Sequence, residues 1–139
     1  MEVTFGVVTF NSEKTIIETL ESIRIQVEQH GKKHNNYLVI SDDCSNDQTV
    51  QFISLWTNKY EQIFEEVRII QTQKNSGLCA NYAQLMQNIK TELFIPLAGD
   101  DLISSGDIYH DLSSLHENEI RVHLTLEFCK ETVYNKPED

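Results

Sequence analysis

Basic residues are scarce in this sequence. It has 11 Lys and Arg against 22 Asp and Glu, which gives a formal net charge of -11 at pH 7. The arginines, Arg24, Arg68 and Arg121, are scattered along the chain, and Lys32-Lys33 is the only basic pair. Proteins that bind nucleic acid usually have a basic surface, so we expect no nucleic-acid partner. An anionic small ligand would need a cation at its site to offset the negative field.

Long apolar runs and signal-like segments are also missing. No run approaches the ~20 residues that a membrane-spanning helix needs, and the first residues lack the basic and apolar regions of a signal peptide. Cys44, Cys79 and Cys129 have no paired spacing, which suits a reducing compartment. We therefore expect no membrane span and a cytoplasmic location, either free or peripheral at the inner face of the membrane.

Two common nucleotide-binding motifs are absent as well. The sequence contains neither GxGxxG nor GxxxxGK[ST]. A dinucleotide fold of the usual kind and a P-loop are therefore not predicted.

Apolar segments of two kinds alternate along the 139 residues, a length that fits one domain or part of one. Five segments have the composition of strands. The first is followed by apolar residues at the spacing of one helix face, namely Ile16, Leu20, Ile23 and Val27. Ser45 to Gln48 has the form of a capping box for the second helix. Strands are predicted at 2–10, 37–41, 67–71, 93–97 and 120–128, with helices beginning near residues 12, 45, 75 and 104. This alternation predicts an α/β fold with a mainly parallel sheet covered by helices.

Two acidic pairs follow predicted strands, Asp42-Asp43 and Asp100-Asp101. Two carboxylates 4 Å apart repel by about 4 kcal/mol at an effective dielectric constant of 20. Hydrogen-bond donors or a divalent cation could offset that repulsion. Open α/β sheets bind ligands just beyond such strand ends, although aspartate is also common in turns and helix caps.

Two further strand-to-helix junctions contain candidate ligand-binding residues, Thr9-Phe10-Asn11 and Lys74 to Gly77. Phe10 could be a core aromatic residue, or it could stack on a nucleobase. Asn75 to Gly77 could be a simple helix start, or its backbone could hold a phosphate group at a helix N-terminus. Parallel strands would bring all four junctions to one edge of the sheet.

Taken together, the junctions resemble the donor-binding half of the family 2 glycosyltransferases, which have the GT-A fold. The match extends over about residues 3 to 103, in the family's order. The four blocks are Val7 to Ser12, Val39 to Thr49, Asn75 to Tyr82 and Glu92 to Asp101. In this order they resemble the family patterns P-T-Y-N, V-D-D-x-S-x-D-x-T, N-x-G-x-x-x-N-F and D-x-D-D. Val8 replaces the usual proline, and Ala98 stands where many members have the first aspartate.

The resemblance implies roles for individual residues. Thr9 and Phe10 would line the pocket for the nucleobase, and Asp43, with Asp42 beside it, would accept a hydrogen bond from that base. Asp100 and Asp101 would contact the ribose and hold Mg²⁺ or Mn²⁺ on the diphosphate. The residues expected to shape the rest of the donor pocket are Asn75, Gly77 and Asn81.

The resemblance also implies an activity. We expect residues 1–139 to be a single nucleotide-sugar-binding domain with a Rossmann-like GT-A architecture, ending before the acceptor half. The expected enzyme is a metal-dependent, inverting glycosyltransferase that acts on a saccharide or lipid-linked acceptor in surface polysaccharide synthesis. The family's catalytic base lies in the acceptor half, so no base is predicted within this chain.

Two alternatives remain open from the sequence. The chain could be a non-catalytic nucleotide-sugar-binding module, which would keep the four junctions and lack the base. It could also be a nucleotidyltransferase with a related sheet. That class predicts a basic, glycine-rich loop after the first strand, and Asn11 to Lys14 is not such a loop.

Overall fold

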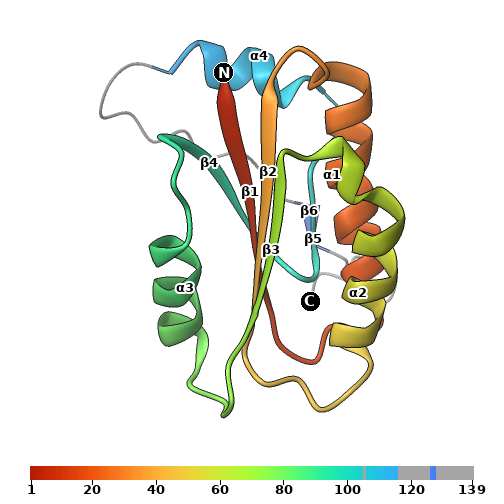
Figure 1. Ribbon diagram of the computed structural model, residues 1–139, viewed down its shortest axis with the longest axis vertical. Helices are drawn as coiled ribbons and strands as arrows, with labels where there is room; N and C mark the ends of the chain where they lie inside the picture. Colours follow the sequence, from red (N-terminus) through yellow and green to blue (C-terminus); the bar gives the residue numbers. More distant parts are fainter. Residues whose placement is uncertain (105, 116–125, 128–139) are drawn as a thin grey trace, which may run out of the picture.

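The computed structural model describes residues 1–104 and 106–115, and the backbone of residues 126–127. Its centre is a parallel sheet with the strand order β3-β2-β1-β4 (Figure 1). The strands are β1 (Glu2–Thr9), β2 (Asn35–Asp42), β3 (Glu66–Gln71) and β4 (Leu93–Ala98). The α/β fold with a mainly parallel sheet is therefore confirmed.

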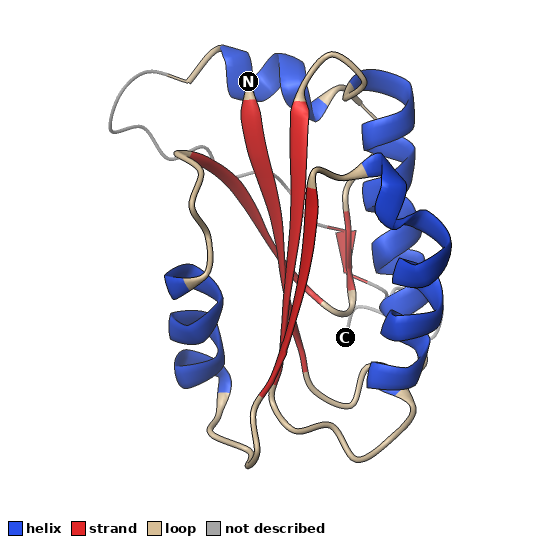
Figure 2. Cartoon of the chain, in the orientation of Figure 1, coloured by secondary structure: helices blue, strands red, loops and turns tan. Residues whose placement is uncertain are grey.

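Helices cover both faces of the sheet. Figure 2 shows α1 (Ile16–His30) and α2 (Thr49–Tyr60) on one side and α3 (Leu78–Gln87) on the other. A short helix, α4 (Ile108–Ser113), lies near the amino ends of β1 and β2 (Figure 1). The remaining elements are a 3₁₀ helix (Glu61–Ile63) and an antiparallel pair, β5 (Asp101–Leu102) and β6 (Leu126–Glu127). No helix in the described part of the chain is long and apolar enough to cross a membrane.

The two faces of the sheet bury different amounts of apolar surface. The larger cluster lies under α1, α2 and α4, and Phe5, Ile23 and Leu38 are completely buried within it. The smaller cluster lies under α3 and is centred on Val8, Val39 and Leu85. Each apolar side chain removed from water contributes roughly 1.5–3 kcal/mol, so the α1–α2 face is the main source of stability.

Several predicted boundaries were wrong. Helix α1 begins at Ile16 with Thr15 as its N-cap, a few residues after the start predicted near residue 12. The predicted capping box at Ser45 is also wrong, because α2 begins at Thr49 and its N-cap, Gln48, makes no side-chain capping bond. The strand predicted at 120–128 lies mostly outside the described residues, and only its segment at 126–127 is seen as β6.

Candidate functional site

The four junctions meet at the carboxyl edge of the sheet, in the lower half of the molecule in Figure 1. The strands end in register there, with Thr9 beside Asp42 and Asp42 beside Gln71. Backbone bonds continue this alignment into the loops: the Asp43 amide donates to the Thr9 carbonyl and the Gly99 amide to the Val8 carbonyl, both at 2.9 Å. The expected convergence of the junctions is confirmed, with Asp43 and Asp101 at the same edge.

Asp42 is completely buried and organises the first two loops. Its Oδ1 accepts hydrogen bonds from the Thr9 hydroxyl at 2.7 Å and the Ser45 hydroxyl at 2.6 Å. Its Oδ2 accepts a third bond, at 2.9 Å, from the Ser45 amide. Thr9 is also buried, so both side chains form their hydrogen bonds within the protein, and their expected places beside the nucleobase stay predictions.

Asp43 connects the second junction to the third. Its two oxygens accept hydrogen bonds from the amides of Ser76 and Gly77, each at 2.8 Å, and from the Thr72 hydroxyl at 3.2 Å. Hydrogen bonds to a charged acceptor are the stronger kind, and they offset the repulsion between Asp42 and Asp43 without a metal. A carboxylate can accept about four such bonds, so Asp43 keeps capacity for one more donor.

The start of α3 is shaped by Gly77 and Asn81. Gly77 is the N-cap and has a φ of 91°, a backbone conformation that favours glycine. Asn75 is exposed, and its Oδ1 accepts from the Gly77 amide at 3.1 Å. Asn81 is buried, accepts from the Ser41 hydroxyl at 2.6 Å and donates to the Thr9 carbonyl at 3.3 Å. Asn81 therefore fixes α3 against the ends of β1 and β2.

The first two junctions interlock through backbone conformations that most residues avoid. Asn11 has a φ of 47° and Cys44 a φ of 60°. The Asn11 amide donates to the Ser45 hydroxyl at 2.8 Å, and the Asn46 amide donates to the Asn11 side chain at 3.0 Å. Such outliers persist where the surrounding structure holds them, often at functional sites. The sequence signal was weak, because it consisted only of an asparagine, a residue that tolerates this region.

Phe10 directly precedes Asn11 in the sequence and is 46% exposed. The interpretation of Phe10 as a core residue is therefore wrong. An exposed aromatic ring at this edge of the sheet is available for stacking. Its contact with a nucleobase stays a prediction.

Asp47 completes the connection between the loops, a role that the sequence did not indicate. Its carboxylate accepts from the Thr49 amide at 2.9 Å, the Thr49 hydroxyl at 2.6 Å and the Glu13 amide at 3.2 Å. Burial alone would raise the pKa of Asp47, but the hydrogen bonds from Thr49 and Glu13 hold that pKa below its usual value.

Asp100 and Asp101 have far fewer partners. Asp100 is exposed and has no hydrogen bond or ion pair within the described residues. Asp101 accepts one bond, from the Ala98 amide at 2.9 Å. A side chain at Gly99 would place its Cβ 2.8 Å from the Ser12 hydroxyl oxygen, so a larger residue would require Ser12 to shift. Burial raises the pKa of Tyr82 on α3, and the charges of Asp101 and Asp100 raise it further.

The described side chains at this edge could supply some, but not all, of the oxygen ligands of a bound cation. The described residues contain no group of three or more His, Cys, Asp or Glu side chains that could hold a metal ion alone. Magnesium in nucleotide sites is typically bound by one or two carboxylates together with substrate phosphates and water. Asp100 and Asp101 fit a site of this shared kind, in which the phosphates of the ligand and water supply the remaining oxygens.

Sequence comparison places these blocks in one family. The profile of Glycosyl transferase family 2 matches residues 4–135. A stretch of 69 residues is 38% identical to poly(ribitol-phosphate) beta-N-acetylglucosaminyltransferase TarS of Staphylococcus aureus strains Mu50 and MW2. That stretch is 50% of this chain and 11% of TarS.

Structural comparison gives the same picture. The crystal structure of S. aureus TarS 1-349 in complex with UDP matches with a TM-score of 0.63 and 26% identity, covering 81% of this chain and 31% of that one. The complex of TarS 1-349 with UDP-GlcNAc also matches at 0.63, with 27% identity, covering 81% and 30%. A mannosyltransferase from Pyrobaculum calidifontis with GDP-Man and Mn²⁺ shares the fold at 0.59 and 20% identity, covering 72% and 28%. The GT-A architecture is thus confirmed, and the chain spans about a third of the structures it matches.

Proposed function

The chain belongs to glycosyl transferase family 2, and we propose that its carboxyl edge binds the nucleotide-sugar donor of an inverting transfer reaction. One observation carries this proposal: the ends of the paired strands β1 and β4 bring Phe10, whose ring is exposed, and Asp100, whose carboxylate has no partner among the described residues, to the same edge. A nucleoside diphosphate has an aromatic base at one end and phosphate oxygens at the other. Its two ends therefore match these two side chains.

The nucleobase end is assigned to the first three junctions. Phe10 would stack on the base, and the remaining acceptor capacity of Asp43 would bind an N–H group of the base. Thr9, Asp42 and Asn81 would support the pocket without touching the donor, because their buried hydrogen bonds hold the loops in place. The TarS structures contain UDP and UDP-GlcNAc, so a uridine nucleotide is the first ligand to test.

The diphosphate end is assigned to Asp100 and Asp101. These carboxylates would hold Mg²⁺ or Mn²⁺ against the diphosphate, and the cation would neutralise the negative charge of the leaving group. Without a cation, the acidic edge repels a diphosphate, since the whole chain has a net charge of -11. The backbone around Gly77 would lie beside the donor at the start of α3.

In the proposed reaction, an acceptor hydroxyl attacks the anomeric carbon of the sugar as the bond from that carbon to the diphosphate oxygen breaks. The hydroxyl proton passes to a general base, and we assign no residue of this chain to that role. The acceptor would be a saccharide or a lipid-linked saccharide of a surface polysaccharide, and the reaction would take place in the cytoplasm or at the inner face of the membrane. In the alternative of a donor-binding module without a base, the same edge would bind the donor and no transfer would follow.

Calorimetry tests the donor site directly. UDP and UDP-GlcNAc are titrated into the chain with Mn²⁺ and then with excess chelator. We expect binding that weakens at least tenfold in chelator, the equivalent of about 1.4 kcal/mol, and that weakens similarly with Phe10→Ala. Glu65→Gln removes a charge at an exposed position on the opposite edge and should bind as the parent does. Equal affinity in metal and in chelator would disprove the metal role, and unchanged affinity of Phe10→Ala would disprove the stacking role.

A further inference from the structure

Helix α3 covers only part of its face of the sheet. The helix has 10 residues and is about 15 Å long, whereas β1 and β2 have 8 residues each and span about 26 Å. Gly6 marks the covered part, because a Cβ there would lie 3.1 Å from Leu85 and 3.2 Å from Ile89. Within the described residues, no helix covers the amino-terminal half of the same face.

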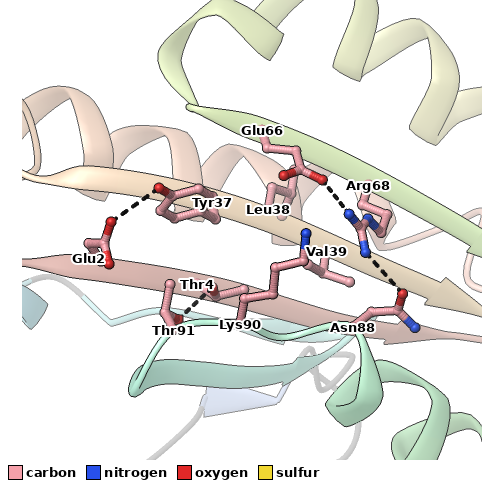
Figure 3. A pocket seen from close by; sticks show the side chains of 10 residues that line it. All are labelled: Glu2, Thr4, Tyr37, Leu38, Val39, Glu66, Arg68, Asn88, Lys90 and Thr91. Carbon is pink, nitrogen blue, oxygen red and sulfur yellow. Dashed lines mark hydrogen bonds and ion pairs between the residues drawn. The ribbon is translucent and has the colours of Figure 1, made fainter.

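A cavity of about 290 Å³ occupies this uncovered half (Figure 3). Its lining includes residues from the starts of three strands and from the connection between α3 and β4, among them Glu2, Thr4, Tyr37, Glu66, Arg68 and Lys90. The functional edge lies at the opposite ends of the strands, about 20 Å away at 3.3 Å per residue. The cavity is therefore separate from the donor site.

The polar groups of this cavity are balanced in charge. Arg68 pairs with Glu66 at 2.7 Å and donates to the Asn88 side chain at 3.2 Å. The Tyr37 hydroxyl donates to Glu2 at 3.4 Å. Lys90 is exposed and has no hydrogen bond or ion pair within the described residues. The lining thus contains two carboxylates and two cations, together with the half-buried ring of Tyr37.

We propose that this cavity binds a neutral, hydroxyl-rich ligand, a single saccharide unit. Each sugar hydroxyl can donate one hydrogen bond and accept others, so it can use both the carboxylates and the cations. An anion would be repelled by Glu2 and Glu66, and a cation by Arg68 and Lys90. An apolar ligand would remove four charged groups from water without replacing their hydrogen bonds.

Tyr37 supplies the second part of the argument. The C–H face of a sugar ring is apolar, and a half-buried aromatic ring offers it a flat apolar surface beside polar groups. The volume is near the lower end of the range for small-molecule pockets, which suits one sugar unit. This proposal goes beyond the donor site, since it concerns the opposite end of the sheet.

The experiment is an NMR titration of the ¹⁵N-labelled chain with glucose and with N-acetylglucosamine, and with inorganic phosphate as the charged comparison. We expect saturable shifts for amides at residues 2–4, 37–39 and 88–91, with no shifts at residues 9–12 or 99–101. The absence of saturable shifts with either sugar, or saturation by phosphate alone at the same amides, would overturn the proposal. Sugar-induced shifts confined to the carboxyl edge would also overturn it.

Two variants of one residue separate a binding contact from a structural one. Tyr37→Phe keeps the ring and should retain most of the sugar affinity, whereas Tyr37→Ala should weaken it about fivefold. Both variants should melt near the parent and bind UDP unchanged, because Tyr37 lies outside both apolar clusters and far from the donor edge. Equal sugar affinity of Tyr37→Ala and the parent would refute the role of the ring. Failure of UDP binding in the parent would instead count against the donor site alone.

Discussion

The two Asp-Asp pairs of this chain have the same sequence and opposite surroundings. Asp42 and Asp43 are buried, and each carboxylate accepts three hydrogen bonds from neighbouring loops. Asp100 is exposed without a hydrogen-bond partner in the described residues, and Asp101 accepts one bond. A buried carboxylate that accepts several bonds from the loops builds the site, whereas an exposed one has most of its acceptor capacity left for a ligand. Substitutions in the two pairs should therefore affect different properties.

The largest expected loss of stability comes from Asp42→Ala. The change leaves the Thr9 hydroxyl and two Ser45 donors without their acceptor. Hydrogen bonds to charged groups contribute about 1.5–3 kcal/mol each, and the losses are not additive, so we expect a fall of about 3 kcal/mol in the free energy of unfolding. Urea denaturation measures this, with Asp100→Ala as the matched control. Similar losses for the two variants would contradict the distinction between the pairs.

Asp43→Ala should follow, with a loss of about 2 kcal/mol. It releases the amides of Ser76 and Gly77 at the start of α3, where the chain bends through the positive φ of Gly77. Asp43→Asn keeps an oxygen acceptor and should lose less. Hydrogen exchange without ligand should show faster exchange at residues 76–78 in the alanine variant. Unchanged exchange at these residues would refute the idea that Asp43 holds the start of α3 in place.

Asp47 should make stability depend on pH by a smaller amount. Its folded-state pKa lies below its usual value, through the bonds from Thr49 and Glu13. A carboxylate with a depressed pKa stabilises the fold above its unfolded pKa of about 3.9, and that contribution is lost as the pH falls through the folded value. The difference in unfolding free energy between the parent and Asp47→Asn should therefore be present at pH 7 and shrink below about pH 4. A difference that is constant over this range would contradict the assignment.

The sequence predicted the position of the site better than its internal connections. Alternating strands and helices were sufficient to bring Asp43 and Asp101 to one edge, because parallel strands end on the same side. The capping box failed because Ser45 bonds to Asp42 and Asn11 instead of to a helix terminus. These partners are 3 and 34 residues away from Ser45, and the 34-residue contact depends on strand register.

The exposure of Phe10 is a second feature that the sequence could not predict. An aromatic residue after a buried strand is usually itself buried. Phe10 is exposed, and the residue that follows it, Asn11, has a positive φ and is bonded to the second junction. The sequence does not show this arrangement. The separate roles of the two acidic pairs were equally hidden. Both follow an apolar strand in the sequence, and only the donors around them distinguish the pairs.

The smallest stability effect, and the most informative, is expected from Asp100→Asn. Asp100 has no described hydrogen bond to lose, and removing its charge relieves repulsion with Asp101. Surface changes usually stay within about 0.5 kcal/mol, so the melting temperature without ligand should be unchanged or slightly raised. The binding of UDP in the presence of Mn²⁺ should weaken, because an amide oxygen is a poorer ligand for a hard cation than a carboxylate.

Asp101→Asn sharpens this last test. An amide oxygen can still accept the bond from Ala98, so the stability of this variant should also remain close to that of the parent. The alternative in which Asp101 caps the following helix is wrong, since α4 begins at Ile108 and Asp107 caps it through Tyr109 and His110. Calorimetry with Mn²⁺ and with chelator, on both asparagine variants, measures the metal-dependent part of UDP binding. Loss of this part without loss of stability would support the ligand role, whereas a lower melting temperature with unchanged metal-dependent binding would refute it.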